Sequence, residues 1–304
     1  MAGRTLDLDL DLDLDLDLDL RFGGGGGGGP RFNSEDFTKL APPIANIPLP
    51  TKPFSANWNK EFRAWAYVHE LITANIWSGK TPVTFLYEKI NADGGFKVPA
   101  MFLPAGDVPA GNALNAAELG AQVQGVLDAA LDRGDRGMEI LHQASGAGAL
   151  KYWTGLLRID PSQEPNTFLL MLVARKFGEY IAMGLKGRYL MRRPSQVYPH
   201  IMPLLDPPNH PSFPSAHSLE GHLITGVLKK ALPAGAAESV RALDHLARRI
   251  AQNREIAGVH YKMDTDAGIC AARWIITQLD TLANASLYKT LVNAAAGELS
   301  DFRY

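Results

Sequence analysis

The sequence of 304 residues has almost no cysteine, and it has no long apolar stretch that is free of charge. The single cysteine, Cys270, excludes an intrachain disulfide and any zinc site built from several cysteines. The most apolar long window, residues 167–185, contains Arg175, Lys176 and Glu179, which are too costly in an ordinary membrane-spanning helix. The N-terminus lacks the basic and apolar regions of a secretory signal. We therefore expect a cytoplasmic protein without a membrane span.

An excess of positive charge is also lacking. The formal net charge is −2 and the isoelectric point is near 6.4, which excludes the broadly basic surface that makes nucleic acid the default partner. Any attraction for anions must be local. We therefore expect a small-molecule substrate and no nucleic acid.

The first 36 residues differ from the rest of the chain. Leucine and aspartate alternate strictly over residues 6–20, and residues 23–29 are all glycine. A lone strand with a carboxylate at every second position repels itself, and a glycine run makes a flexible linker. We predict that residues 1–36 are a disordered Leu-Asp repeat and Gly linker, and that residues 37–304 form a single α-helical catalytic domain.

Apolar residues recur at helical spacing through most of that domain, and no β-branched runs bounded by turns compete with this pattern. The periodicity predicts helices over residues 57–77, 113–132, 135–144, 147–157, 164–186, 215–231, 236–258, 264–281 and 283–297. The fold is predicted to be all-α, a helical bundle. Bundles with long amphipathic faces commonly dimerise, so a homodimer is among the expected states.

Three short segments carry candidate chemistry. Lys186 and Arg193 are seven residues apart, which places both cations on one face of a helix that Pro194 ends. On its own such a pair is usually a solvated surface pair.

The second segment is the sequence PSAHS at residues 214–218. Ser215 is a typical N-cap, and the following helix would present the backbone N–H groups of Ala216 and His217 to an anion. The alternative is a capped helix without a ligand.

In the third segment His260 and Asp264 are four residues apart, so that on a helix the carboxylate reaches imidazole Nδ1–H and leaves Nε2 as a nucleophile or ligand. Arg254 precedes them across Gly258. A structural His-Asp pair is the more common interpretation of these two residues in isolation.

In this order, K-x6-R-P, P-S-x-H and R-x5-H-x3-D resemble the three-part signature of one superfamily. It contains type-2 phosphatidic acid phosphatases, class A acid phosphatases and vanadium-dependent haloperoxidases. The resemblance covers residues 186–268 and implies a helical bundle of the vanadium haloperoxidase and acid phosphatase type.

The resemblance also implies roles for individual residues. The oxyanion, phosphate or vanadate, would be held by Lys186, Arg193, Ser215, Ala216 and Arg254. Paired, charge-assisted donors suit such a guest. The catalytic residues would be His260, His217 and Asp264. His260 would be the nucleophile or the ligand of vanadium, Asp264 would fix its tautomer, and His217 would be the general acid and base.

The sequence departs from the family pattern at three positions. Ala216 replaces a glycine and crowds the anion with its methyl group, and Asn253 replaces a serine and alters a supporting hydrogen bond. Met183 stands where similar haloperoxidases carry tryptophan beside the halide, which weakens the halogenation hypothesis. His210 supports that hypothesis, because algal bromoperoxidases also have histidine there, which suggests a halide or peroxide site. A solvent-exposed loop histidine is the equal alternative.

Three functions stay open at this point. The favoured one, by a narrow margin, is a vanadate-dependent haloperoxidase that oxidises halide with hydrogen peroxide. The second is a metal-free acid phosphatase that acts on a phosphate ester through a phosphohistidine and needs no cofactor. The third is a non-catalytic oxyanion-binding helical protein.

Overall fold

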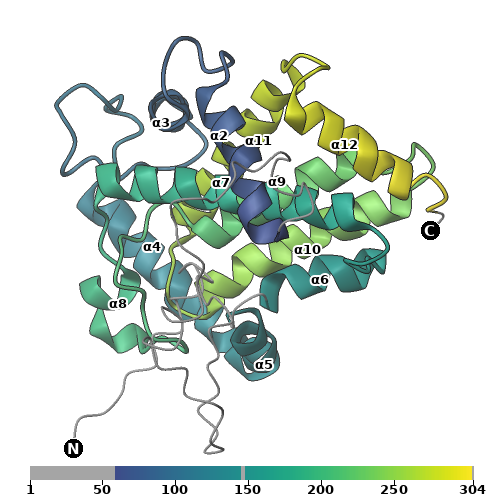
Figure 1. The fold of residues 1–304 in the computed structure, drawn as a ribbon. Coiled ribbons are helices and arrows are strands. Elements are labelled where there is room, and N and C mark those ends of the chain that lie inside the picture. Colours follow the sequence, from purple (N-terminus) through teal and green to yellow (C-terminus); the bar gives the residue numbers. More distant parts are fainter. Residues whose placement is uncertain (1–58, 145–147, 303–304) are drawn as a thin grey trace, which may run out of the picture.

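The computed structural model describes residues 59–144 and 148–302, and helices make up most of this part of the chain (Figure 1). In chain order the helices are α2 (Lys60–Thr73), α3 (Pro82–Ala92), α4 (Ala116–Ala129), the 3-10 helix η3 (Ala130–Asp132), α5 (Arg133–Gln143), α6 (Gly148–Leu157), α7 (Pro165–Tyr189), α8 (Pro194–Val197), the 3-10 helix η4 (Pro199–Ile201), α9 (Ala216–Ala231), α10 (Ala237–Ile256), α11 (Lys262–Asp280) and α12 (Leu287–Glu298). Within these described ranges no strand forms, and Val98 and Ala113 make only an isolated bridge. The predicted all-α bundle is confirmed.

Helix α9 lies at the centre of the bundle and packs against α7, α10, α11 and α12 (Figure 1). Its leucine, isoleucine and valine residues are almost fully buried. Burial of such apolar surface is the dominant favourable contribution to folding. Two glycines of the bundle permit close helix approach. A Cβ at Gly268 of α11 would lie 2.8 Å from the carbonyl oxygen of Ser215, and one at Gly178 of α7 would lie 2.8 Å from Cγ of Glu220. The N-terminal turns of α9 are therefore held tightly between α7 and α11.

The periodicity located most helices to within a few residues, but it missed α3. A proline inside an apolar pattern usually ends a helix, whereas Pro82 is the first residue of α3. Proline suits a first helical position because its missing N–H would have no partner there, and the Thr81 hydroxyl accepts a hydrogen bond from the N–H of Thr84. A proline beside a capping residue starts this helix rather than ending one.

Residues 1–36, for which a Leu-Asp repeat and a linker were predicted, lie outside the described residues. Among the helices that the structure describes, none combines the length and the apolar character that a membrane crossing requires.

Candidate active site

Lys186 and Arg193 approach each other, but they do not share a helix as predicted. Helix α7 ends at Tyr189 and Leu190 adopts a left-handed conformation, so the chain turns before Pro194 is reached. Arg193 is extended and is the N-cap of α8. The two cations converge because the loop that follows folds back over the end of α7.

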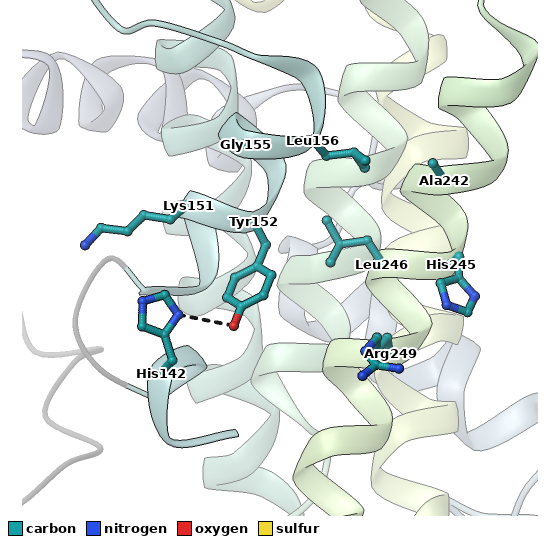
Figure 2. A pocket seen from close by; sticks show the side chains of 9 residues that line it. All are labelled: His142, Lys151, Tyr152, Gly155, Leu156, Ala242, His245, Leu246 and Arg249. Carbon is teal, nitrogen blue, oxygen red and sulfur yellow. Dashed lines mark hydrogen bonds between the residues drawn. The ribbon is translucent and has the colours of Figure 1, made fainter. Parts of the chain in front are cut away.

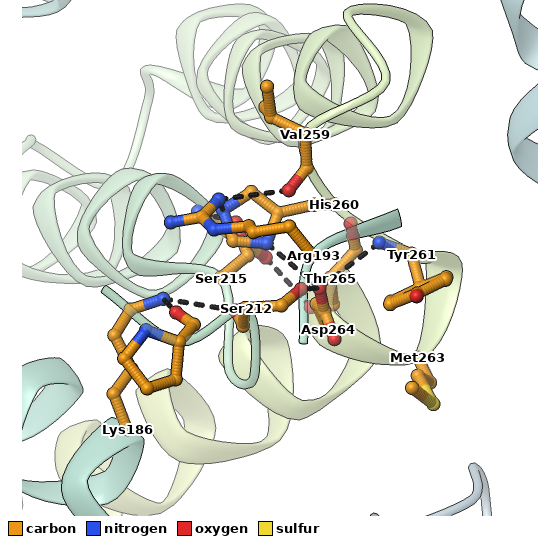
Figure 3. Close-up of polar contacts among 12 residues, drawn as sticks. Lys186, Arg193, Ser212, Ser215, Val259, His260, Tyr261, Met263, Asp264 and Thr265 are labelled. Carbon is orange, nitrogen blue, oxygen red and sulfur yellow. Dashed lines mark hydrogen bonds and ion pairs between the residues drawn. The ribbon is translucent and has the colours of Figure 1, made fainter. Parts of the chain in front are cut away.

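The Lys186 side chain is buried against that loop. Its Nζ donates hydrogen bonds to the carbonyl oxygens of Pro211 at 2.6 Å and Ser212 at 2.9 Å, and the residue is only 1% exposed (Figure 3). These acceptors fix the ammonium group without neutralising its charge.

The Arg193 guanidinium is likewise buried and links two loops (Figure 3). Its Nε donates to the carbonyl oxygen of His210 at 3.1 Å, and one terminal nitrogen donates to the carbonyl oxygen of Val259 at 2.9 Å. That same nitrogen lies 3.1 Å from His260 Nε2, while the other lies 3.1 Å from His210 Nδ1. One arginine therefore contacts both candidate histidines.

The predicted cap of α9 is present and is attached to α11. The Ser215 side chain accepts a hydrogen bond from the N–H of Ser218, as an N-cap does. The N–H of Ser215 donates to the carbonyl oxygen of Asp264 at 3.0 Å, and Ser218 Oγ donates to that of Thr265 at 2.8 Å. Ala216, the first residue of α9, is buried beside them. These bonds hold the start of α9 next to the His260 loop.

His260 and Asp264 form the expected contact, although they are not on one helix turn. His260 precedes α11, and Asp264 is in the first turn of that helix, where its Oδ2 accepts a hydrogen bond from the N–H of Tyr261 at 3.1 Å. His260 Nδ1 lies 2.9 Å from the same Oδ2, and both side chains are almost fully buried. Ser212 Oγ also donates to it. Asp264 thus acts as a capping residue, and this places its carboxylate under the imidazole.

This contact determines which imidazole nitrogen is free to react. With Nδ1–H donated to Asp264, His260 Nε2 carries the lone pair, which accepts from Arg193. Burial, followed by the charges of Arg193, Lys186 and Arg254, lowers the pKa of His260 well below its usual value. The structure therefore keeps this imidazole neutral.

The partner carboxylate and the second histidine are perturbed by the same surroundings. Burial raises the pKa of Asp264 to about 6, against hydrogen bonds from Ser212 and Tyr261 that lower it. Burial and the charge of Arg254 lower the pKa of His217 well below its usual value. The charge of Arg254 also lowers the pKa of His260, so the same cation acts on both histidines.

Asn253, where the family pattern has serine, belongs to the support of α10. Its amide nitrogen donates to Gln143 Oε1 at 2.7 Å and to Glu139 Oε1 at 3.0 Å, and its oxygen accepts from Arg136 at 2.5 Å. It therefore ties α10, which carries Arg254, to α5.

His210 lies inside the pocket rather than on an exposed loop. Its Nδ1 is near Arg193, and its Nε2 is buried with no hydrogen-bond partner among the described residues. Burial, with the charges of Lys186 and Arg193, lowers its pKa to about 3. His210 is therefore neutral, and its Nδ1 lies both 3.1 Å from the Arg193 guanidinium and 3.2 Å from the carbonyl oxygen of Pro211, two neighbours that favour opposite tautomers.

The structure brings together the residues that the motifs predicted, and their roles stay predictions. Sequence reasoning missed Ser212, whose hydroxyl and carbonyl oxygen contact Asp264 and Lys186; its position three residues before the cap Ser215 is the signal that could have found it. The histidines expected to be surface or packing residues are exposed or half-buried: His69, His142, His200, His222 and His245.

Comparison with known proteins gives a partial match. No family model matches the chain. Two non-specific acid phosphatases, from Salmonella typhimurium (strain LT2) and Salmonella typhi, are each 33% identical to it over 119 residues. That match takes in 36% of this chain and 45% of each relative, so it spans less than half of the relatives' length. The chain thus resembles the superfamily that joins acid phosphatases and vanadium-dependent haloperoxidases, as the motifs predicted.

Among solved structures, a bacterial vanadium-dependent iodoperoxidase is similar with a TM-score of 0.35 and 15% identity. The similarity covers 78% of this chain and 52% of that one.

Proposed function

We propose that the protein hydrolyses phosphoric monoesters through a phosphohistidine at His260. The observation that carries the proposal is a neutral, buried imidazole, braced by Asp264, whose Nε2 lies against the guanidinium of Arg193. The similarity to acid phosphatases over part of the chain supports hydrolysis, which the sequence alone placed second.

Three buried cations support a phosphate group as the ligand. Lys186, Arg193 and Arg254 are each at most 3% exposed, and their charges act on the same histidines. Several charge-assisted donors that converge on one place suit a multiply charged anion. A phosphoryl group offers oxygens to these donors and to the backbone N–H groups at the start of α9.

In the first step His260 Nε2 attacks phosphorus, a P–N bond forms, and the P–O bond to the leaving group breaks. His217 donates a proton to the leaving oxygen. In the second step His217 takes a proton from water as the water oxygen attacks phosphorus, and the P–N bond breaks to release phosphate. The cations stabilise the charge on the phosphoryl oxygens throughout.

His217 must be protonated for the first step, although its pKa is lowered in the protein without an anion. A phosphate dianion compensates the charge of Arg254 and its neighbours, so binding of the substrate raises the pKa of His217. Binding of the substrate and protonation of His217 are therefore coupled.

Vanadate-dependent halide oxidation is the second candidate, and His210 favours it. Vanadate has the shape and charge of phosphate, so the same donors fit it, with His260 Nε2 as the ligand of vanadium. Bound vanadate would supply the activation of hydrogen peroxide. The Nε2 atom of His210, buried and without a hydrogen-bond partner among the described residues, is available to peroxide or halide.

One set of assays separates the candidates. The purified full chain is incubated with p-nitrophenyl phosphate with and without vanadate, and then with vanadate, peroxide, bromide or iodide and a halogenation dye. Hydrolysis that vanadate inhibits, with an acid-labile phosphoryl label that His260→Ala abolishes, supports the proposal. Halogenation that requires vanadate, without hydrolysis, supports the second candidate. Neither activity would leave a non-catalytic oxyanion-binding protein.

A further inference from the structure

A hollow lies between α6 and α10, with the end of α5 beside it (Figure 2). Its volume is about 670 Å³. The residues that line it are His142, Lys151, Tyr152, Gly155, Leu156, Ala242, His245, Leu246 and Arg249. The catalytic proposal uses none of them.

The chemistry of this groove is divided between its middle and its rim. Leu156 and Leu246 face each other across the gap between the two helices, and Leu156 is 40% exposed. Basic side chains or histidines surround this apolar floor, and no acidic residue is among those that line it. Exposed apolar surface of this kind, rimmed by polar groups, is typical of an interaction site.

The basic character continues along α10. An adjoining hollow of about 390 Å³ shares His245 and Arg249 with the groove and is also lined by Arg136, Arg248, Lys262 and the acidic Glu255. Glu139 pairs with Arg249 and Arg136, and Asp266 pairs with Lys262, but Lys151 of the groove and Arg248 of the adjoining hollow are exposed. An occupant that fits must combine apolar side chains with negative charge.

We propose that the groove binds residues 6–20 of the same chain, the Leu-Asp segment. In an extended backbone, successive side chains point to opposite sides, so eight leucines form one edge and seven aspartates the other. With the leucine edge on the apolar floor, the aspartate edge points to solvent above the basic rim, where the opposite charges still attract each other. Binding to cations would also relieve the repulsion among the aspartates.

Charge and chain length agree with this occupant. The segment carries seven negative charges and no positive one, so the rest of the chain has a formal charge of +5 against −2 for the whole. Thirty-eight residues separate it from Asn59, a length that spans more than the molecule when extended. The described chain also starts near the groove, since Lys60 donates to the carbonyl oxygen of Pro161, just beyond the end of α6.

A photocross-linking experiment on the full chain tests the proposal. Leu12 is replaced by p-benzoylphenylalanine, and the cross-linked peptides are mapped by mass spectrometry after irradiation. We expect cross-links to the segments around Leu156 and Leu246. Raising the salt concentration to about 0.5 M should reduce them about threefold or more, because the charge contacts are exposed to solvent.

Two charge variants and one isotope mixture make the result decisive. The double variant Lys151→Glu, Arg248→Glu should lower the yield about fivefold, because it places charges of the same sign beside the aspartates. Lys80→Glu, at the distant connection between α2 and α3, should leave it unchanged. Equal yields in all variants, or cross-links mapped elsewhere, would overturn the proposal.

Mixing ¹⁴N- and ¹⁵N-labelled protein distinguishes the two possible sources of the segment. Cross-links within one isotope support the proposal, and cross-links between isotopes would assign the groove to a second copy and overturn it. His260→Ala should not change the yield, so this inference stands or fails independently of the catalytic proposal.

Discussion

Helix α10 carries two arginines five residues apart whose surroundings differ in kind. Arg249 pairs with the carboxylate of Glu139 at 2.5 Å, and this contact joins α10 to α5. Arg254, one turn and a half further along, is buried with Lys186 and Arg193 around the histidines. The cluster around Arg249 contains its own counter-charge, the carboxylate of Glu139.

In the pocket, backbone carbonyl oxygens receive the hydrogen bonds of Lys186 and Arg193. Carbonyl groups position a cation by hydrogen bonds, whereas the Glu139 carboxylate pairs with Arg249 directly. Under the proposed function, the first arrangement places cations for an anion and the second joins two helices. Positive charge alone does not distinguish the two clusters, because both are rich in arginine.

The largest effect is expected at the histidine between the cations. His260→Ala should lower kcat/KM for p-nitrophenyl phosphate by roughly 10⁴-fold, because the nucleophile is lost while the phosphate donors remain. His142→Ala, in the groove on the other side of α6, should leave the activity unchanged. Circular dichroism checks the fold of both variants. Substantial turnover in the first variant would end the assignment of His260.

Arginine-to-lysine exchanges test the comparison directly. Arg193→Lys keeps the charge but loses the fork that contacts His210, Val259 and His260, so kcat/KM should fall about 10²-fold. Arg249→Lys should change activity less than about twofold and reduce the free energy of unfolding by at most about 1 kcal/mol. Steady-state kinetics and urea unfolding measure the two effects. Equal losses of activity would show that the two clusters do not differ in function.

The helices of this fold were predictable because their apolar spacing is a local property of the sequence. Helix α3 was not, because Pro82 fits both the end of one helix and the start of the next. A proline has the same fixed φ in either position, and only the capping contact of Thr81 distinguishes them.

The site residues were predictable as types, but their geometry was not. Lys186 and Arg193 were placed on one helix, yet Leu190 ends α7 earlier and a loop brings the two cations together. Similarly, the four-residue spacing of His260 and Asp264 works through a helix cap instead of a helix face. Ser212 makes its contacts through the tertiary fold, which no local pattern encodes.

The pH dependence of stability should separate a pocket histidine from a groove histidine. The pKa of His210 is lowered to about 3, so the unfolded chain binds a proton below pH 6.5 that the folded chain does not. This residue therefore costs stability as the pH falls below 6.5, by about 2 kcal/mol between pH 7 and 5. His210→Asn should remove this part of the slope in urea unfolding, whereas His142→Asn should not. An unchanged slope in His210→Asn would contradict a buried, neutral His210.

The smallest expected effect is on the stability of variants at two carboxylates, Glu139 and Glu220. Burial raises the pKa of Glu139, but hydrogen bonds from Arg249 and Asn253 outweigh it and the pKa is lowered. Burial and the charge of Glu179 on α7 instead raise the pKa of Glu220 to about 8, although Arg175, Lys186 and Arg254 oppose this.

The folded chain thus keeps a proton on Glu220 that the unfolded chain releases above pH 4.5, so this group costs stability as the pH rises from 4.5 through 8. The stability of Glu220→Gln relative to the unaltered protein should therefore rise from pH 5 to pH 8.5. Glu139→Gln, which leaves Arg249 without its counter-charge, should be less stable at pH 8.5. Thermal unfolding of both variants at the two pH values measures this, and a loss of stability in both at pH 8.5 would show that Glu220 is paired after all.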